Sequence, residues 1–168
     1  SMGGWIVTLL CYESPERVNK VVNVAGGGTA TRPLQNMVEF KVPTPEQIKD
    51  QMSHRFPQGS VDIEEVAAFA IEKIGLTGHG DAFAGVMRHM TDPDTRIRYN
   101  TLRRMPHIKA PTLVCWGTDD QTNAFEMGEQ TAETIPDAKL VAFEGVGHML
   151  PQQAAERFNQ VVLEFLAG

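Results

Sequence analysis

Two patterns of hydrophobic and polar positions run along the chain. Continuous apolar runs, typical of parallel strands covered on both faces, predict strands. Apolar residues that recur every three or four positions predict amphipathic helices that pack against a sheet. The strands are expected over 19–25, 111–117 and 138–144, and the helices over 3–13, 125–135 and 152–166. This alternation predicts an α/β protein with a mainly parallel sheet and flanking helices.

The stretch between the first two strands has a different pattern. It is rich in Met and Phe and is interrupted by prolines, and helices are expected over 46–52, 63–74, 81–90 and 95–105. Pro45 and either Asp62 or Ser60 suit the starts of the first two of these helices. An all-helical insertion between two strands of a parallel sheet predicts a helical lid. The chain then divides into a helix and strand of the core, the lid, and the remaining core strands and helices, over residues 1–28, 29–106 and 107–168.

Composition narrows the class of protein. The chain has 168 residues, of which 42% are hydrophobic, and a net charge of −6. The negative charge argues against nucleic acid or an anionic membrane as the main partner, and no run approaches the roughly 20 apolar residues of a membrane span. Cys11 and Cys115 lie in apolar runs, so buried free thiols in a cytoplasmic protein are expected, with a disulfide as the alternative. No metal or organic cofactor is expected.

Serine, acid and histidine occur in an order that suggests nucleophilic catalysis. Ser1 precedes the first helix, Asp119 and Asp120 follow the second strand, and His148 follows a glycine-rich turn after the third strand. A serine hydroxyl becomes a useful nucleophile when a histidine takes its proton, and a carboxylate holds that histidine in the required tautomer. Serine, acid, histidine is the order of the triad in α/β-hydrolases.

The start of the chain matches the second half of a nucleophile elbow. That turn reads Gly-x-Ser-x-Gly between a strand and a helix, and Ser1-Met2-Gly3 supplies its last three positions. Ser1 is therefore the expected nucleophile, and a terminal serine without a role is the alternative. The backbone N–H of Met2 is expected in the oxyanion hole, because the elbow turns this group towards the reacting carbonyl.

Together these residues resemble a known family. The chain is similar to the carboxyl-terminal part of an α/β-hydrolase, and within that fold to the meta-cleavage product hydrolases, which hydrolyse a carbon–carbon bond in vinylogous 1,5-diketones. The motifs that carry the resemblance are Ser1-Met2-Gly3-Gly4, Pro15-Glu16-Arg17-Val18, Gly26-Gly27-Gly28-Thr29, Ile108 to Gly117, Gly147-His148 and Phe158 to Val162. The family pattern Trp-Gly-x-x-Asp selects Asp120 over Asp119 as the acid. Gly27, Gly28 and Met149 are expected to contact substrate.

Two departures from the family keep other functions open. Family members commonly have a tryptophan after the catalytic histidine, where this chain has Met149. They also bind the substrate carboxylate with a lid arginine, which is absent near Gln51 and near 69–71, although Arg88 or Arg55 could replace it. A carboxylic ester or lactone hydrolase of the same fold is therefore the first alternative. A non-catalytic ligand-binding protein with a hydrolase-like fold is the second.

The expected partners follow from the incomplete sheet. Three parallel strands leave unprotected edges, so further strands are expected from the N-terminal portion of the same precursor, present as a separate chain. A break before Ser1 suggests self-cleavage, in which the serine hydroxyl attacks the preceding carbonyl. A small-molecule substrate is expected, and a homo-oligomer is possible.

Overall fold

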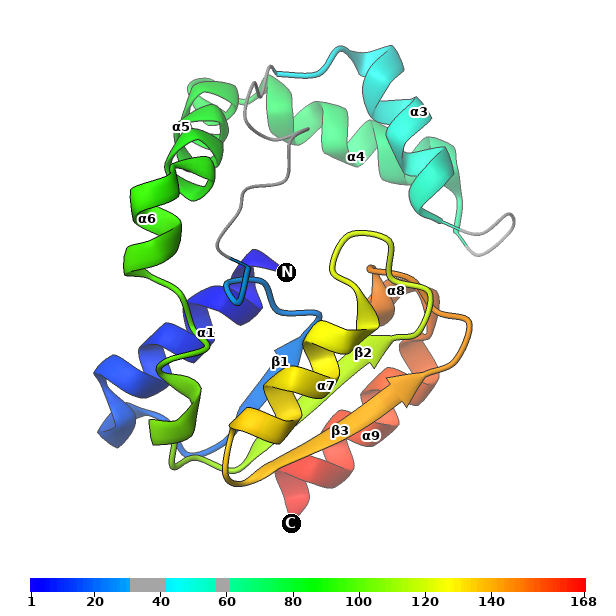
Figure 1. The fold of residues 1–168 in the computed structure, drawn as a ribbon. Coiled ribbons are helices and arrows are strands. Elements are labelled where there is room, and N and C mark those ends of the chain that lie inside the picture. The colour runs from blue at the N-terminus through cyan, green and yellow to red at the C-terminus, as the bar shows by residue number, and fades with distance from the viewer. Residues whose placement is uncertain (31–41, 57–60) are drawn as a thin grey trace. The chain divides into compact units, whose positions relative to one another are not determined.

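The computed structural model describes residues 1–30, 42–56 and 61–168 and divides into two compact units (Figure 1). The sheet unit comprises Ser1–Ala30 and Tyr99–Gly168, and the helical unit is Thr31–Arg98. The helical unit is thus inserted in the sequence of the sheet unit. Residues 99–106, which sequence patterns assign to the insertion, group with the sheet unit in this division.

The sheet unit is built on three parallel strands. β1 (Val21–Val24), β2 (Thr112–Gly117) and β3 (Ala138–Phe143) lie in the order β1-β2-β3. All six residues of the central strand β2 are buried, as a parallel strand with covered faces requires. The three predicted strands are therefore confirmed, with slightly shorter ends. The additional strands expected from a companion chain stay a prediction.

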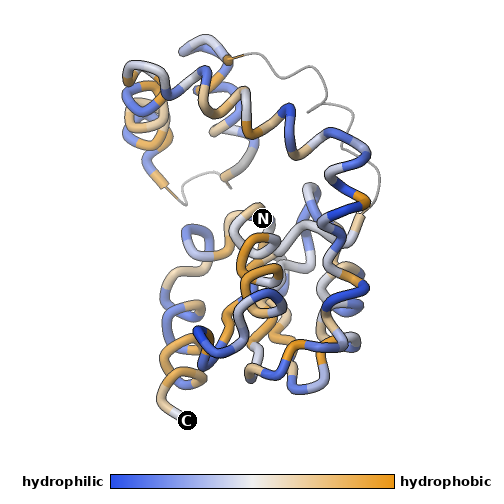
Figure 2. The backbone as a smooth tube through the Cα atoms, turned by 90° about the vertical axis from the view of Figure 1, so that its left-hand side faces the viewer, coloured by the Kyte–Doolittle hydropathy of each residue, from blue (hydrophilic) through white to orange (hydrophobic). Residues whose placement is uncertain are grey.

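Helices cover the sheet on both faces. α7 crosses one face and α9 lies behind the other, while α1 runs beside β1 (Figure 1). Figure 2 shows α1, next to the N label, as a mostly apolar helix. The helices are α1 (Met2–Glu13), α7 (Phe125–Thr134), α8 (Leu150–Gln153) and α9 (Ala155–Ala167), with short 3-10 turns η1 (Pro15–Arg17) and η2 (Met105–His107). The single closing helix predicted over 152–166 is wrong in one respect, because the backbone at Ala154 has a non-helical φ of −137° and separates α8 from α9.

The core of the sheet unit forms where β2 and β3 meet these helices. Trp116, Phe143 and Leu150 are fully buried there, and the rings of Phe143 and Phe158 lie 6.3 Å apart in a tilted pair. Both cysteines are free and buried, as expected. Burial raises the pKa of the Cys115 thiol to about 12, so this group stays protonated at neutral pH and is a poor nucleophile.

The helical unit has well-defined helix starts. Thr44 and Gln47 form a reciprocal capping box around Pro45 at the start of α3, and Asp62 accepts two backbone N–H groups at the start of α4. The starts predicted at Pro45 and Asp62 are thus confirmed, and Ser60 lies outside the described residues. The helices of this unit are α3 (Pro45–Arg55), α4 (Ile63–Gly75), α5 (His79–Thr91) and α6 (Pro93–Arg98). Among the described residues, no helix is long and apolar enough to cross a membrane.

The helix predicted over 95–105 ends early, at Arg98. The next residues form hydrogen bonds with distant parts of the sheet unit instead of continuing the helix. The Trp5 indole donates to the carbonyl of Tyr99 at 2.8 Å, and the Thr101 N–H donates to the carbonyl of Gly28 at 2.9 Å. Partners so far away in the sequence override the local helical pattern.

Candidate active site

Ser1 lies where the carboxyl end of β1 meets the amino end of α1. The Ser1 nitrogen donates to the carbonyl of Val24 at 3.0 Å, and the Gly27 N–H donates to the carbonyl of Ser1, also at 3.0 Å. The Trp5 N–H donates to the same carbonyl at 3.2 Å and closes the first turn of the helix. Two backbone contacts therefore fix Ser1 to the turn that follows β1, and the residue itself is exposed.

The first residue of α1 offers a backbone donor beside Ser1. α1 begins at Met2, and the first N–H groups of a helix have no partner within the helix. Among the described residues no acceptor is bonded to the Met2 N–H. The positive end of the helix dipole also favours negative charge at this place. This geometry is compatible with the predicted oxyanion-hole donor, which stays a prediction.

Asp120 and His148 form a short hydrogen bond at the ends of β2 and β3. Asp120 Oδ2 and His148 Nδ1 are 2.7 Å apart, and the Asp120 side chain is fully buried. The other carboxylate oxygen, Oδ1, accepts the N–H groups of Thr122 at 2.8 Å and Asn123 at 2.9 Å. Both oxygens of this buried carboxylate are thus satisfied, which holds its orientation.

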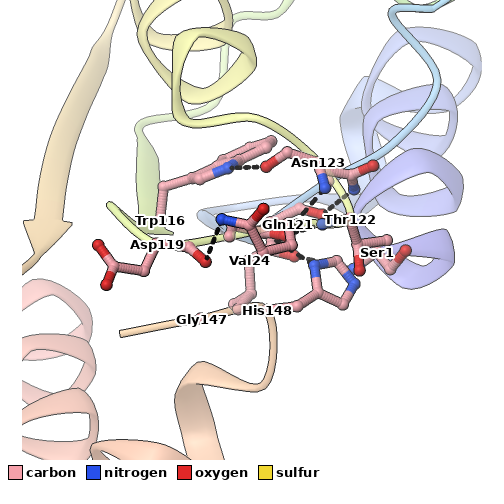
Figure 3. Close-up of polar contacts among 12 residues, drawn as sticks. Ser1, Val24, Trp116, Asp119, Gln121, Thr122, Asn123, Gly147 and His148 are labelled. Carbon is pink, nitrogen blue, oxygen red and sulfur yellow. Dashed lines mark hydrogen bonds and ion pairs between the residues drawn. The ribbon is translucent and has the colours of Figure 1, made fainter. Parts of the chain in front are cut away.

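Asp119 has a different environment. It is exposed, its carboxylate accepts the Thr118 hydroxyl at 3.1 Å, and its N–H donates to the carbonyl of Val146. In Figure 3 its carboxylate points away from His148. The structure therefore brings His148 together with Asp120 and leaves Asp119 outside the pair.

The loop that carries His148 is held by the residue that follows β2 and by α8. The Gly145 N–H donates to the Thr118 hydroxyl at 2.9 Å, and the Gly147 N–H donates to Gln153 Oε1 at 2.8 Å. The imidazole, with a side chain only 18% exposed, is directed towards Ser1 (Figure 3). No hydrogen bond joins Ser1 Oγ to this ring within the described part of the chain. Such a bond is often long in ligand-free enzymes and shortens when substrate binds.

Gly117 allows the end of β2 to approach the histidine loop. A Cβ atom at this position would lie 2.0 Å from the carbonyl oxygen of Val146 and 2.6 Å from that of Gly147. Both atoms belong to the backbone, so they cannot move aside without shifting the loop that positions His148.

We expect Gly117→Ala to lower the free energy of unfolding by about 1–3 kcal/mol, because this overpacking strains the backbone. Gly85→Ala in α5 is the control, since its nearest neighbour would be the flexible Arg88 side chain at 3.9 Å. This control should be neutral or more stable by up to ~1 kcal/mol, because alanine favours a helix interior. Urea denaturation measures both changes, and equal stability of the two variants would contradict the packing described.

The residues predicted to contact substrate have structural contacts. The Gly27 N–H is bonded to Ser1, and Gly28 accepts from Thr101. Gly28 has a φ of +97°, and a Cβ atom there would lie 2.3 Å from the Trp5 ring, so this position requires glycine. Met149 is half-buried, and its carbonyl accepts the N–H groups of Gln152 and Gln153 at the start of α8. Contact of Gly27, Gly28 and Met149 with substrate stays a prediction.

Sequence patterns did not indicate two buried asparagines. Asn23 interrupts the apolar run of β1, donates to the Thr8 hydroxyl at 3.1 Å and accepts the Gly26 N–H at 3.1 Å. Asn123 donates to the carbonyl of Ala25 at 2.8 Å. A polar residue within the apolar run Val-Val-Asn-Val could have indicated that Asn23 is buried. Asn123 lies in a polar loop, where nothing in the sequence indicates its burial. In the described ranges, no three His, Cys, Asp or Glu side chains gather in a metal-binding arrangement.

Comparison with known proteins places the chain in a family. Residues 1–153 match the Hydrolase_4 family, described as serine aminopeptidase, S33. A 2-hydroxy-6-oxononadienedioate/2-hydroxy-6-oxononatrienedioate hydrolase from Burkholderia vietnamiensis is 32% identical over 177 residues, which cover 99% of this chain and 60% of that protein. The chain therefore spans about 60% of the length of curated relatives that it matches.

Solved structures share the fold at lower identity. A 2-hydroxy-6-oxo-6-phenylhexa-2,4-dienoate hydrolase from a Rhodococcus species superposes with a TM-score of 0.85 at 18% identity, covering 100% of this chain and 62% of that one. A thermophilic esterase from Thermogutta terrifontis gives a TM-score of 0.69 at 22% identity, covering 99% of this chain and 62% of its own. The matching family model and the shared fold agree, and the chain belongs to the Hydrolase_4 family of α/β-hydrolases.

Proposed function

We propose that Ser1, Asp120 and His148 form the catalytic triad of a serine hydrolase. The observation that carries the proposal is the 2.7 Å hydrogen bond between Asp120 and His148, with the imidazole directed towards Ser1. A buried carboxylate bonded to Nδ1 keeps the proton on that nitrogen, so Nε2 is free to accept the proton of a serine hydroxyl. An isolated structural histidine has no need of such an arrangement beside a serine at a helix start.

The triad would act on a carbonyl carbon. Ser1 Oγ forms a bond to that carbon while His148 Nε2 takes the hydroxyl proton, and the Met2 N–H stabilises the negative oxygen that results. The bond to the leaving group then breaks, and the leaving group takes the proton from His148. A water molecule, deprotonated by the same imidazole, hydrolyses the acyl–enzyme and restores the serine hydroxyl.

We propose further that the bond broken is a carbon–carbon bond in a dienone-acid or diketone substrate of aromatic degradation. The name of the Burkholderia vietnamiensis relative, at 32% identity, supports this substrate class. A carbon leaving group needs its electron pair delocalised, and a dienone acid provides this once it has reached its keto tautomer. The triad histidine is placed to assist that proton transfer as well as the attack.

An ester or lactone hydrolase is the second candidate. Met149 stands where the carbon–carbon hydrolases commonly have tryptophan, and the esterase from Thermogutta terrifontis shares the fold. Arg88 and Arg55 are the two arginines that could replace the missing lid arginine and bind a substrate carboxylate. Arg88 is exposed on α5 in the helical unit. The side chain of Arg55 lies outside the described part of the structure.

The helical unit is proposed to be the lid. In the sequence it is inserted between β1 and β2, and the carboxyl ends of these strands carry the turn that holds Ser1 and the loop that holds Asp120. Loops at the carboxyl ends of parallel strands are the usual position of ligand sites in such sheets.

Turnover of two substrates separates the candidates. We expect kcat/KM for 2-hydroxy-6-oxononadienedioate, followed by loss of the dienone absorbance, to exceed that for p-nitrophenyl acetate by about 100-fold or more. His148→Ala should abolish both activities. Turnover of the ester alone would favour the second candidate, and turnover of neither by folded protein would contradict the proposed triad.

A further inference from the structure

Asn123 joins the loop that carries the acid to the turn that ends β1. Its side-chain Nδ2 donates to the carbonyl oxygen of Ala25 at 2.8 Å, between residues 98 positions apart in the sequence. Asn123 is only 8% exposed, so the contact is shielded from water. A buried hydrogen bond of this kind holds two segments in one relative position, because breaking it would leave both groups unsatisfied.

The backbone of Asn123 is fixed as well. Its N–H donates to Asp120 Oδ1 at 2.9 Å, and its carbonyl accepts the Trp116 indole N–H, also at 2.9 Å. Figure 3 shows the bond from the Trp116 indole to Asn123. The residue that reaches Ala25 is thus the same residue that holds one oxygen of the acid.

Ala25, which accepts the hydrogen bond from Asn123, lies in the turn that holds Ser1. Ala25 is fully buried and has a φ of +44°, a left-handed conformation that costs a non-glycine residue energy and persists only where its surroundings impose it. Its N–H donates to the carbonyl of Cys115 at 3.0 Å, and its carbonyl accepts Asn123. Val24, directly before Ala25, and Gly27, two residues after it, make the two backbone bonds to Ser1.

We propose that Asn123 is a positioning residue that sets the placement of Ser1 relative to the Asp120–His148 pair. It acts through Ala25 on the nucleophile side and through Asp120 on the acid side. The inference rests on the proposed triad. Without the amide donor, the loop that holds Asp120 and the turn that holds Ser1 could shift relative to each other. The carbonyl of Ala25 would also lose its partner.

The test compares two substitutions in the same loop of the purified protein. Asn123→Leu has nearly the shape of asparagine but cannot donate to Ala25. Gln121→Leu is the matched control, because it also replaces an amide side chain of this loop, but an exposed one whose Nε2 donates to the carbonyl of Asp119 at 3.4 Å and not to the turn that holds Ser1. We expect Asn123→Leu to lower kcat about tenfold with KM within twofold, and Gln121→Leu to leave both within twofold.

A readout without turnover separates this inference from the proposed function. In a proton NMR spectrum, the His148 Nδ1 proton bonded to Asp120 should give a low-field resonance that disappears in His148→Ala. We expect this resonance to move upfield or broaden in Asn123→Leu and to stay unchanged in Gln121→Leu. Protein without hydrolase activity but with these spectral changes would refute the proposed reaction and support the positioning role.

A third variant tests the proposal if Asn123→Leu does not fold. Asn123→Asp keeps the shape, and its carboxyl can donate to Ala25 when it is protonated. Its kcat relative to wild type at the same pH should rise as the pH falls. Folded Asn123→Leu with wild-type kcat and resonance, or Asn123→Asp with a relative kcat independent of pH, would overturn the proposal. A raised KM with unchanged kcat would also overturn it, since that indicates substrate contact.

Discussion

His148→Ala and Ser1→Ala should each lower kcat by about 10⁴-fold or more, and the double variant should be scarcely slower than either one. The reason is that in the proposed triad the imidazole and the hydroxyl would take part in a single proton transfer, so that removing one would leave the other without a function. The short bond of His148 to a buried carboxylate and its direction towards Ser1 motivate the expectation. Single-turnover and steady-state kinetics on whichever substrate is accepted measure the effect.

His107→Ala is the matched control for the histidine variant. His107 is exposed, lies in the same unit as His148, and packs its ring against Tyr12 at 5.9 Å between centroids. Its loss should leave kcat within about twofold of the wild type, as for surface substitutions away from the site. If His148→Ala retained near wild-type turnover, or if the losses of the two single variants multiplied in the double variant, the triad would be wrong.

Asp120→Asn should lower kcat by about 10³–10⁴-fold, whereas Asp119→Asn should change it by less than about threefold. The hydrogen bonds around Asp120 explain why so small a change is expected to be severe. Two backbone N–H groups, from Thr122 and Asn123, bond to Oδ1. They would hold the oxygen of an asparagine amide in that place and turn its NH₂ group towards His148 Nδ1.

An NH₂ group facing Nδ1 forces the imidazole into the wrong tautomer. Nδ1 must then accept, the ring proton moves to Nε2, and Nε2 can no longer take the proton of Ser1. Asp119 has no such role, because its carboxylate accepts the Thr118 hydroxyl, and an asparagine oxygen can accept it equally well. A larger loss in Asp119→Asn than in Asp120→Asn would place the acid one residue earlier.

The regular elements were accessible from the sequence, because their apolar periodicity reflects burial on a sheet. The strands around Val21, Thr112 and Ala138 followed from this pattern. The choice of Asp120 over Asp119 as the partner of His148 came from the family motif Trp-Gly-x-x-Asp. The end of α6 did not, because Tyr99 and Thr101 form bonds with Trp5 and Gly28, which lie more than seventy positions earlier in the chain.

The hydrogen bond from Asn123 to Ala25 could not be predicted for the same physical reason. Its local sequence, Gln-Thr-Asn-Ala, is ordinary for a polar loop, and its partner Ala25 becomes a neighbour only when β1 and β2 pair. Periodicity records which side of an element is buried. It carries no information on which single hydrogen bond joins two loops at the end of a sheet.

Covalent labelling of Ser1 tests the central claim most directly. A fluorophosphonate reacts with a serine hydroxyl only when a neighbouring base activates it. The account predicts one adduct, located by peptide mass spectrometry at Ser1, formed in the wild-type protein and in His107→Ala but lost in His148→Ala. An adduct at another residue, or labelling of Ser1 that persists at the wild-type rate in His148→Ala, would contradict it.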